Sequence, residues 1–234
     1  MLGVIIAAGR GGRLSNVTGG MPKTLLLVNG KPIIQWIIDE SYASGIKEFL
    51  VVTGYNSEKI RDYFNKNPRA NLTFIYNPLW ERGNGISVLS VEKMIDRSKE
   101  FVLMMSDHLI EGGVIKAIIK ERRCPLLAVE KNIDKVFDIM DATKVYIDNK
   151  RVISIGKDLK RFNGVDAGLF LLNSLIFHFL KKCIKKGEDS LTAGIQEMIK
   201  RHKLYTYSIP NEVYWIDVDS KESYNNAIQM WRRR

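Results

Sequence analysis

Short apolar runs recur along the first 130 positions, and the stretches between them repeat their apolar residues every three or four positions. Runs that are apolar along their whole length are typical of parallel strands covered on both faces. We predict buried strands at 2–8, 48–53, 72–76, 101–106 and 125–130. We predict helices at 32–44, 56–65, 85–95 and 114–121. Strands and helices that alternate through short connections are typical of a doubly wound α/β sheet.

The pattern changes after residue 130. Strand-like segments at 143–147 and 151–155 flank the turn residues Asp148 and Asn149, which predicts a β-hairpin. Further strands are predicted at 165–171, 204–208 and 213–216, and helices at 174–186, 190–201 and 220–232. The chain contains no internal repeat, linker or low-complexity segment. We therefore expect residues 1–234 to form a single domain in which both halves share one sheet.

Composition narrows the class of protein. Apolar residues make up 45% of the chain and charged residues 26%, which excludes a disordered or collagen-like chain. A net charge of +10 favours anionic partners such as phosphorylated metabolites, a membrane surface or nucleic acid. No nucleic-acid module is recognisable, so we predict no nucleic-acid partner.

The apolar runs and the cysteines bear on where in the cell the protein is found. No stretch approaches the roughly 18 to 20 apolar residues of a membrane-spanning helix. The first apolar run has no basic segment before it and no cleavage-type segment after it, so it does not resemble a signal peptide. Cys124 and Cys183 form neither a metal-binding spacing nor a disulfide framework. These features predict a cytoplasmic protein.

A glycine-rich loop, Gly9-Arg10-Gly11-Gly12-Arg13, directly follows the first predicted strand. Glycines in this position let backbone N–H groups approach phosphate oxygens. The loop is not a dinucleotide fingerprint, because Leu14 stands at the third glycine position. The following Pro22-Lys23-Thr24 is not a P-loop ending, because proline precedes the lysine. The loop therefore predicts a phosphate site of another kind.

Two aspartates stand at the ends of predicted strands. Asp107 follows the run FVLMMS, and Asp217 ends the run VYWID. Carboxylates at the carboxyl ends of buried strands lie at the ligand-binding edge of an α/β sheet, where two of them can hold Mg²⁺. Each could instead cap the helix that follows it, and Asp219 is a nearby alternative ligand or the cap of the last helix. We expect His108 to pack or to orient water.

The order and spacing of three segments resemble the nucleotidyltransferases that join a nucleoside monophosphate to a sugar or alcohol phosphate. These segments are residues 3–13, Pro22-Lys23-Thr24 and residues 29–33. The resemblance implies a Rossmann-like, doubly wound mixed sheet, the GT-A-like nucleotidyltransferase fold. It also implies Mg²⁺ held by Asp107 and Asp217, with Arg13 and Lys23 as the catalytic cations. The nucleotide-binding residues that it implies are Ala7, Ala8, Gly9, Arg10, Gly11, Gly12, Thr53, Asn84, Gly85 and Ser87.

The second half resembles the family members that transfer CMP from CTP to inositol-1-phosphate. The resemblance lies in residues 105–108, 141–145, 155–159, 163–170 and 215–219. It implies CDP-inositol as the product, in di-inositol-phosphate solute biosynthesis. It also implies that residues 1–130 bind the nucleotide and residues 131–234 the acceptor. Lys144 and Lys157 are candidates for the acceptor phosphate, and Asp141 and Asp166 for the inositol hydroxyls, although each could equally serve a turn or the surface.

Several alternatives remain open. Phosphocholine would need an aromatic cage, for which Tyr76, Trp80, Tyr146, Tyr214 and Trp215 are available. A sugar-1-phosphate would also suit the family. A catalytically inactive binding or regulatory subunit on the same fold is the alternative of another class. Some family members carry a C-terminal membrane domain that uses CDP-inositol, and the final segment Trp231-Arg232-Arg233-Arg234 would suit such a fusion at the cytoplasmic membrane face.

Overall fold

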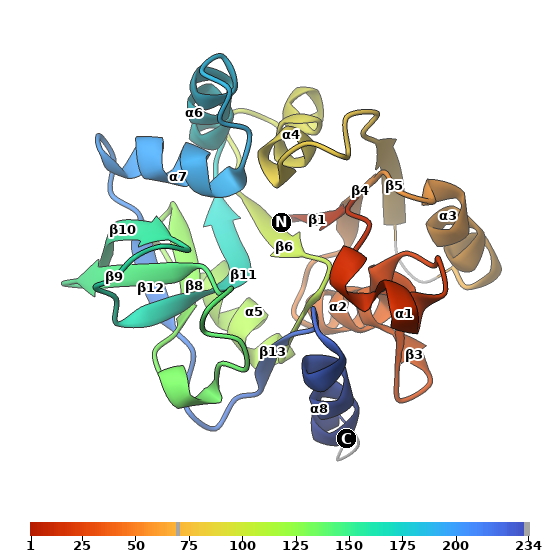
Figure 1. Ribbon diagram of the computed structural model, residues 1–234. Helices are drawn as coiled ribbons and strands as arrows, with labels where there is room; N and C mark the ends of the chain where they lie inside the picture. The colour runs from red at the N-terminus through yellow and green to blue at the C-terminus, as the bar shows by residue number, and fades with distance from the viewer. Residues whose placement is uncertain (69–70, 232–234) are drawn as a thin grey trace.

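A mixed sheet of nine strands forms the centre of the molecule in the computed structural model, which describes residues 1–68 and 71–231 (Figure 1). Across the sheet the strands are β5 (Asn71–Tyr76), β4 (Glu48–Thr53), β1 (Leu2–Ala7), β6 (Phe101–Met105), β11 (Gly164–Leu172), β8 (Leu126–Glu130), β12 (Tyr205–Ser208), β10 (Arg151–Gly156) and β9 (Lys144–Asp148). Strands β5, β4, β1 and β6 are parallel, and β11 runs antiparallel to both β6 and β8. Strands from both halves of the chain therefore share one sheet, as predicted.

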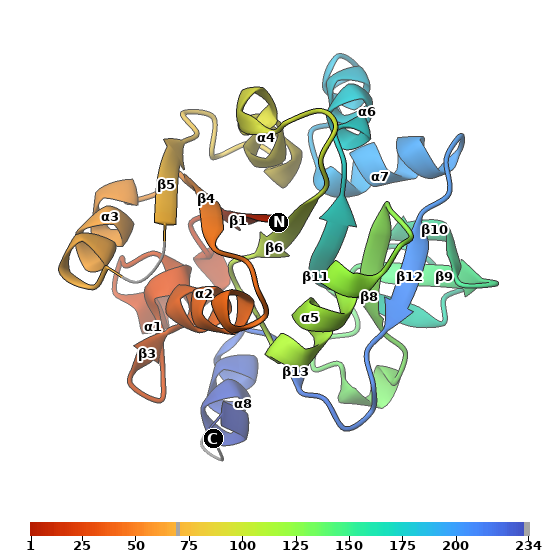
Figure 2. The ribbon, with the colours of Figure 1, turned by 180° about the vertical axis from the view of Figure 1, so that it is seen from behind.

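Helices cover both faces of this sheet (Figures 1 and 2). In both views α4 (Asn84–Leu89), α6 (Leu175–Ile184) and α7 (Leu191–Ile199) lie above the sheet. The opposite face packs against α2 (Ile33–Ala43), α3 (Ser57–Lys66), α5 (Gly112–Lys120) and α8 (Lys221–Trp231). Strand β1 shows why two layers form, because Ile5 belongs to one buried cluster and its neighbours Val4 and Ile6 to the other.

Two small two-stranded sheets were not predicted. Strands β2 (Leu27–Val28) and β3 (Lys31–Pro32) pair after the short helices η1 (Gly12–Leu14), α1 (Ser15–Thr18) and η2 (Lys23–Leu25). Strand β7 (His108–Ile110) pairs antiparallel with β13 (Trp215–Asp217). The strand expected at 213–216 thus lies outside the nine-stranded sheet. Its partner β7 is only three residues long, too short to give a pattern.

Two further expectations needed correction. The helix expected at 85–95 ends at Leu89, and η3 (Glu92–Met94) follows it, because the Ser90 hydroxyl donates to the Ser87 carbonyl at the end of α4. The hairpin of β9 and β10 forms as expected, but its turn is shifted by one residue. Asp148 pairs with Arg151, and the turn residues Asn149 and Lys150 both have positive φ.

The remaining helix η4 (Ile133–Lys135) precedes β9, and α8 closes the described chain. The last helix was expected to reach residue 232, but α8 is described to Trp231, and the arginines 232–234 lie outside the described residues. Within residues 1–68 and 71–231, no helix is both long enough and apolar enough to span a membrane. Cys124 and Cys183 are both free thiols.

Candidate active site

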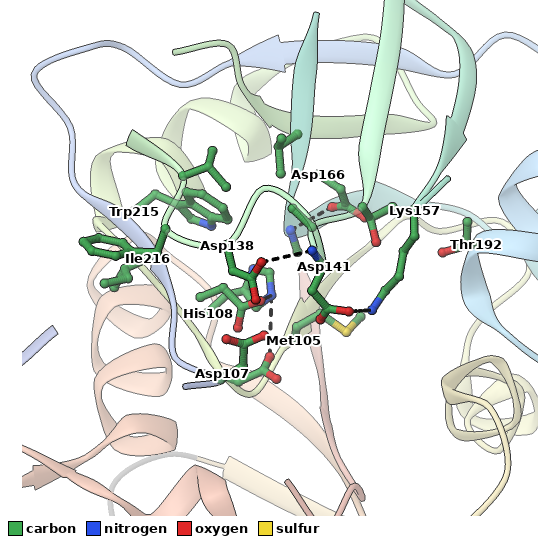
Figure 3. Close-up of a pocket in the computed structure, with 18 of the residues that line it drawn as sticks. Met105, Asp107, His108, Asp138, Asp141, Lys157, Asp166, Thr192, Trp215 and Ile216 are labelled. Carbon is green, nitrogen blue, oxygen red and sulfur yellow. Dashed lines mark hydrogen bonds and ion pairs between the residues drawn. The ribbon is translucent and has the colours of Figure 1, made fainter. Parts of the chain in front are cut away.

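A pocket of about 240 Å³ lies beyond the carboxyl end of β6, next to the small β7–β13 sheet. Figure 3 shows its acidic side chains gathered around His108. Both halves of the chain contribute to its wall. Its polar lining residues are Arg13, Asn84, Asp107, His108, Lys135, Asp138, Asp141, Thr143, Lys157, Asp166, Thr192, Asp217 and Asp219.

Asp107, which lines this pocket, forms an ion pair with Lys23. The Lys23 Nζ lies 2.6 Å from Asp107 Oδ2. The neighbouring Thr24 hydroxyl donates to the Ser106 carbonyl over 3.2 Å, which fixes the Pro22-Lys23 segment against the end of β6. Burial opposes the charge of both groups, but the pairing outweighs it. The pKa of Lys23 is raised, and the pKa of Asp107 is lowered to about 2 by Lys23 and His108.

Asp217 lies directly opposite His108 in the β7–β13 pair. The His108 Nε2 is 3.5 Å from Asp217 Oδ2 and 3.6 Å from Asp107 Oδ1, so the ring lies between the two carboxylates. Burial raises the pKa of Asp217 to about 6, and the charge of Asp107 adds to this while His108 opposes it. The pKa of His108 is raised, because the attraction of Asp217 and Asp107 exceeds the penalty of burial.

The donor atoms of this cluster suit a divalent cation. One ligand atom each from Asp107, His108 and Asp217 lie within 4.8 Å of one another. The Asp217 Oδ1 is buried and has no hydrogen-bond partner. A carboxylate oxygen without a partner is costly when buried, and it is a good ligand for a hard cation such as Mg²⁺. The two aspartates predicted to bind the metal are therefore brought together, and their environment fits it.

Arg13 joins the glycine-rich loop to the acceptor half. Its guanidinium lies 2.6 Å from Asp141 Oδ2 and 2.5 Å from Asp219 Oδ2. Asp141 also pairs with Lys157, whose Nζ lies 2.6 Å from its Oδ1 (Figure 3). Burial works against the charge of Asp141, but Lys157 and Arg13 lower its pKa overall. Asp219 is not the cap of the last helix. The Ser220 hydroxyl accepts from the Ser223 N–H there, and the Asp219 carboxylate is used for Arg13.

The residues predicted to bind the nucleotide fall into two groups. Ala7 ends β1 and Ala8 follows it, and the loop from Gly9 to Gly12 continues directly to Arg13. A Cβ atom on Gly9 or Gly12 would meet no atom within 4 Å, so the backbone of this loop is open. Arg10 lies over the ring of Tyr55, whose N–H donates to the Ala8 carbonyl. This group presents backbone to the neighbouring space, as a phosphate site requires.

The second group supports the protein itself. The Thr53 hydroxyl donates to the Ile75 carbonyl, the buried Ser87 hydroxyl accepts from Asn77, and Gly85 packs tightly against Asp189. The Asn84 side chain accepts from the Leu191 N–H while also lining the pocket. Any contact of this group with a nucleotide would therefore come largely from its backbone, and its binding role stays a prediction.

The acceptor candidates are also divided. Asp141, Lys157 and Asp166 line the pocket. Lys144 does not, because its buried ammonium donates to the carbonyls of Met140 and Lys157 over 3.2 and 2.6 Å. Lys144 thereby holds the loop before β9 in place.

Known proteins are similar to this chain over most of its length. The nucleotidyl transferase family matches residues 2–233. The chain belongs to this family.

The curated relatives are moderately similar over most of the chain. A protein of Archaeoglobus fulgidus named "Bifunctional IPC transferase and DIPP synthase" is 32% identical over 97% of this chain and 43% of its own length. A protein of the same name from Thermococcus kodakarensis is 32% identical over 97% of this chain and 50% of its own length. The chain therefore spans about half the length of these relatives.

A solved structure confirms the expected fold. The inositol-1-phosphate CTP transferase from T. maritima superposes with a TM-score of 0.87, covers 99% of this chain and 96% of its own, and shares 23% identity. At this identity the likeness supports the GT-A-like α/β fold of the nucleotidyl transferase and nothing finer.

Asp138 and Thr192 belong to the pocket of this nucleotidyl transferase but were not predicted from the sequence. Asp138 and Thr192 line the pocket from the loop before β9 and from the start of α7. His108 was expected to pack or to orient water, and its ring faces both aspartates. Asp138 and Thr192 are single polar residues among apolar neighbours and belong to no motif, so no local pattern marks them. For His108 the adjacent Asp107 was the available signal.

Asp166 makes the folding stability of this transferase pH dependent. Burial raises its pKa from 3.8 to about 6, so the folded protein binds this proton more tightly than the unfolded chain. The contribution of Asp166 to stability is therefore greatest below about pH 4 and declines as the pH rises to about 6. We expect Asp166→Asn to flatten the dependence of unfolding free energy on pH in that window. Urea unfolding of both proteins from pH 4 to pH 7 tests this, and parallel curves would contradict it.

Proposed function

We propose that the chain transfers CMP from CTP to inositol-1-phosphate, giving CDP-inositol and pyrophosphate. The observation that carries the proposal is the ion-pair chain Lys157–Asp141–Arg13–Asp219 beside the Lys23–Asp107 pair. It places cations suited to phosphates and carboxylates suited to hydroxyls in one pocket with the candidate metal site. The names of the curated relatives and of the solved transferase support the same reaction.

The reaction needs positioning more than proton transfer. A phosphate oxygen of the acceptor attacks the α-phosphorus of CTP, and the bond to the bridging oxygen of pyrophosphate breaks. The attacking oxygen is already an anion, so no general base is needed. In the proposal, Lys23 and Arg13 bind the oxygens of the α-phosphate and the leaving pyrophosphate, where negative charge develops. The open backbone at Gly9 and Gly12 lets the triphosphate approach the loop.

Asp107 and Asp217 would hold Mg²⁺ in this proposal. When bound, Mg²⁺ supplies positive charge that neutralises phosphate oxygens. The protein's own part is to keep both carboxylates ionised and correctly aimed. Lys23 keeps Asp107 ionised. The pairing of β7 with β13 aims Asp217, and the charge of His108 favours its ionised form against the effect of burial.

The acceptor would bind between the two ion-paired cations and Asp166. Lys157 is proposed to bind the acceptor phosphate, and Asp141 and Asp166 the ring hydroxyls, while Arg13 serves the α-phosphate and the pyrophosphate. Lys144 is left out of this set because its ammonium is bound to backbone carbonyls. Of the five aromatic residues considered for a choline cage, and within the described residues, Trp215 alone lines the pocket. Phe137 and Phe170 also line it, but the carboxylates of Asp141 and Asp166 can accept from polyol hydroxyls, which phosphocholine lacks, and this favours a polyol phosphate.

Lys157 offers a direct test of the acceptor site. We expect Lys157→Met to raise KM for inositol-1-phosphate about tenfold, the loss of one hydrogen bond between charged groups, and to leave KM for CTP unchanged. Its side chain is 55% exposed, so the fold should not suffer. Lys160→Met, an exposed lysine three positions further on, is the matched control. An equal rise in both KM values would place Lys157 outside the acceptor site.

A substrate panel tests the proposed function as a whole. Pyrophosphate release is measured with CTP, Mg²⁺ and either inositol-1-phosphate, phosphocholine or glucose-1-phosphate. The proposal predicts the highest kcat/KM with inositol-1-phosphate. Preference for glucose-1-phosphate would keep the mechanism and change the acceptor. Nucleotide binding without turnover on any acceptor would instead support an inactive binding subunit.

The part of the relatives that this chain does not match concerns how the product is used. Their names join a second activity to the transferase, and this chain matches 43% and 50% of their lengths. We propose that CDP-inositol made here is used by a second activity of that kind, fused or separate, in di-inositol-phosphate synthesis. A cytoplasmic location, including the cytoplasmic membrane face, and the absence of a nucleic-acid partner stay predictions.

A further inference from the structure

The two ring nitrogens of His108 have different surroundings. The Nδ1 lies 2.8 Å from the Ala167 carbonyl oxygen. A carbonyl can only accept, so Nδ1 carries the hydrogen of this bond. In the neutral ring the lone pair is then on Nε2, the nitrogen that faces Asp107 and Asp217. The fold thus selects the tautomer in which the free nitrogen points into the acidic cluster.

The Ala167 carbonyl is itself held in place. It also accepts from the Trp215 Nε1 over 2.9 Å. The next residue, Gly168, has a φ of +70°, and a Cβ there would lie 2.4 Å from His108 Nδ1. The backbone can therefore approach the ring this closely because residue 168 is glycine. A ring N–H anchored on a backbone carbonyl is typical of histidines that bind a metal through the other nitrogen.

The oxygens that face Nε2 are spaced for a shared ion. The Nε2 is 3.5 Å from Asp217 Oδ2 and 3.6 Å from Asp107 Oδ1. Adjacent ligand atoms about 2.1 Å from one ion lie about 3.0 Å apart in octahedral geometry, so each separation here is only about half an ångström wider than a shared ion requires. Lys23 pairs with the other oxygen of Asp107, which leaves Oδ1 facing the ring.

We propose that His108 Nε2 is a third protein ligand to the divalent cation at Asp107 and Asp217. Imidazole nitrogen suits transition metals, whereas Mg²⁺ prefers oxygen. His108 therefore raises the affinity of this site for Mn²⁺ and Co²⁺ relative to Mg²⁺. The inference rests on the proposed function in that a cation is taken to bind here, but it concerns the identity of the ligands, which is measurable without any turnover.

Mn²⁺ itself is the probe. Electron spin-echo spectroscopy of the Mn²⁺-loaded protein, with and without CTP, detects ¹⁴N coupling from a bound imidazole. We expect this coupling in the wild type and its loss in His108→Asn, whose amide can keep the Ala167 contact but cannot reach the position of Nε2. His202→Asn, which changes an exposed histidine outside the pocket, is the matched control and should keep the coupling. Labelling histidine with ¹⁵N in the wild type should replace the ¹⁴N coupling by ¹⁵N coupling. This test needs no variant.

Metal titrations give a second readout. We expect the Kd for Co²⁺ to rise about tenfold in His108→Asn, and the Kd for Mg²⁺ to rise much less. His108→Gln, which can offer an oxygen near the position of Nε2, should regain affinity for Mg²⁺ but not for Co²⁺. Thermal unfolding shows whether each variant is folded, and the labelled wild type decides the question if both variants are not.

Two results would overturn the inference. One is a Mn²⁺ complex of the wild type without histidine nitrogen coupling. The other is an unchanged ratio of Co²⁺ to Mg²⁺ affinity in His108→Asn, which would make the ring a hydrogen-bonding or cationic partner of the carboxylates. Neither result depends on CMP transfer, and failure of CMP transfer to inositol-1-phosphate would not alter either one.

Discussion

Replacing Lys23 with methionine is expected to lower kcat/KM by about 100- to 1,000-fold, the usual cost of losing a donor that stabilises transition-state charge. Methionine fills much of the lysine volume but offers no charge. The Lys23 side chain is 13% exposed and lies 2.6 Å from Asp107 Oδ2, so no solvent cation can take its place as firmly. The variant also leaves Asp107 without its main cation, and we expect a loss of roughly 1 to 3 kcal/mol in unfolding free energy. Steady-state kinetics and urea unfolding measure both effects.

Two variants separate the role of Lys23 from a general loss of charge. Lys47→Met removes an exposed lysine that does not line the pocket, and we expect unchanged kinetics. Lys23→Arg keeps the charge in a larger, planar group, and we expect partial recovery. A kcat/KM for Lys23→Met within about twofold of the wild type would remove Lys23 from the proposed mechanism.

Gly11→Ala is expected to damage the same ion pair from the other side. Gly11 has a φ of +66°, and a Cβ there would lie 2.6 Å from the Cβ of Lys23. That atom is fixed to the backbone and cannot turn away, so the segment of Lys23 must move. A shift of about 1 Å in a positioned group can reduce the rate about 100-fold. We expect a 10- to 100-fold loss of kcat/KM, and a loss of about 2 kcal/mol from the left-handed backbone and the contact together.

The matched control is a glycine without these constraints. Gly113 lies near the start of α5 and does not have a positive φ. A Cβ atom at this position would meet no atom within 4 Å. We expect Gly113→Ala to leave kcat/KM unchanged and to leave stability equal or raised by up to about 1 kcal/mol. If Gly11→Ala behaved like Gly113→Ala, the loop would not position Lys23.

The alternation of apolar runs was sufficient to predict the layers of this fold. Val4 and Ile6 face one layer of helices while Ile5 faces the other, and such a run has few alternatives to a buried strand. The pairing of the strands was harder to predict from the sequence. Strand β7 acquires its identity from β13, which comes more than a hundred residues later. Its three residues carry too little pattern to predict a strand on their own.

The candidate site shows the same division. A motif or a strand end marks each of four residues, Arg13, Lys23, Asp107 and Asp217. In the structure Arg13, Asp107 and Asp217 line one pocket, and Lys23 pairs with Asp107. The sequence gives no reason to distinguish Lys144 from Lys157. In the structure the Lys144 ammonium is bound to backbone carbonyls, whereas Lys157 lines the pocket. Such differences arise from contacts between distant segments. The orientation of His108 is of this kind, since it depends on Ala167.

In the proposed reaction this chain forms a diphosphate bond between CMP and inositol-1-phosphate. Phosphorus NMR of the purified chain with CTP, inositol-1-phosphate and Mg²⁺ tests it most directly. The account predicts the loss of the CTP and inositol-1-phosphate signals in equal amounts. Pyrophosphate and the paired signals of a diphosphate diester should replace them, and Lys23→Met should slow the change at least 100-fold. Unchanged inositol-1-phosphate in the presence of folded protein would contradict the account.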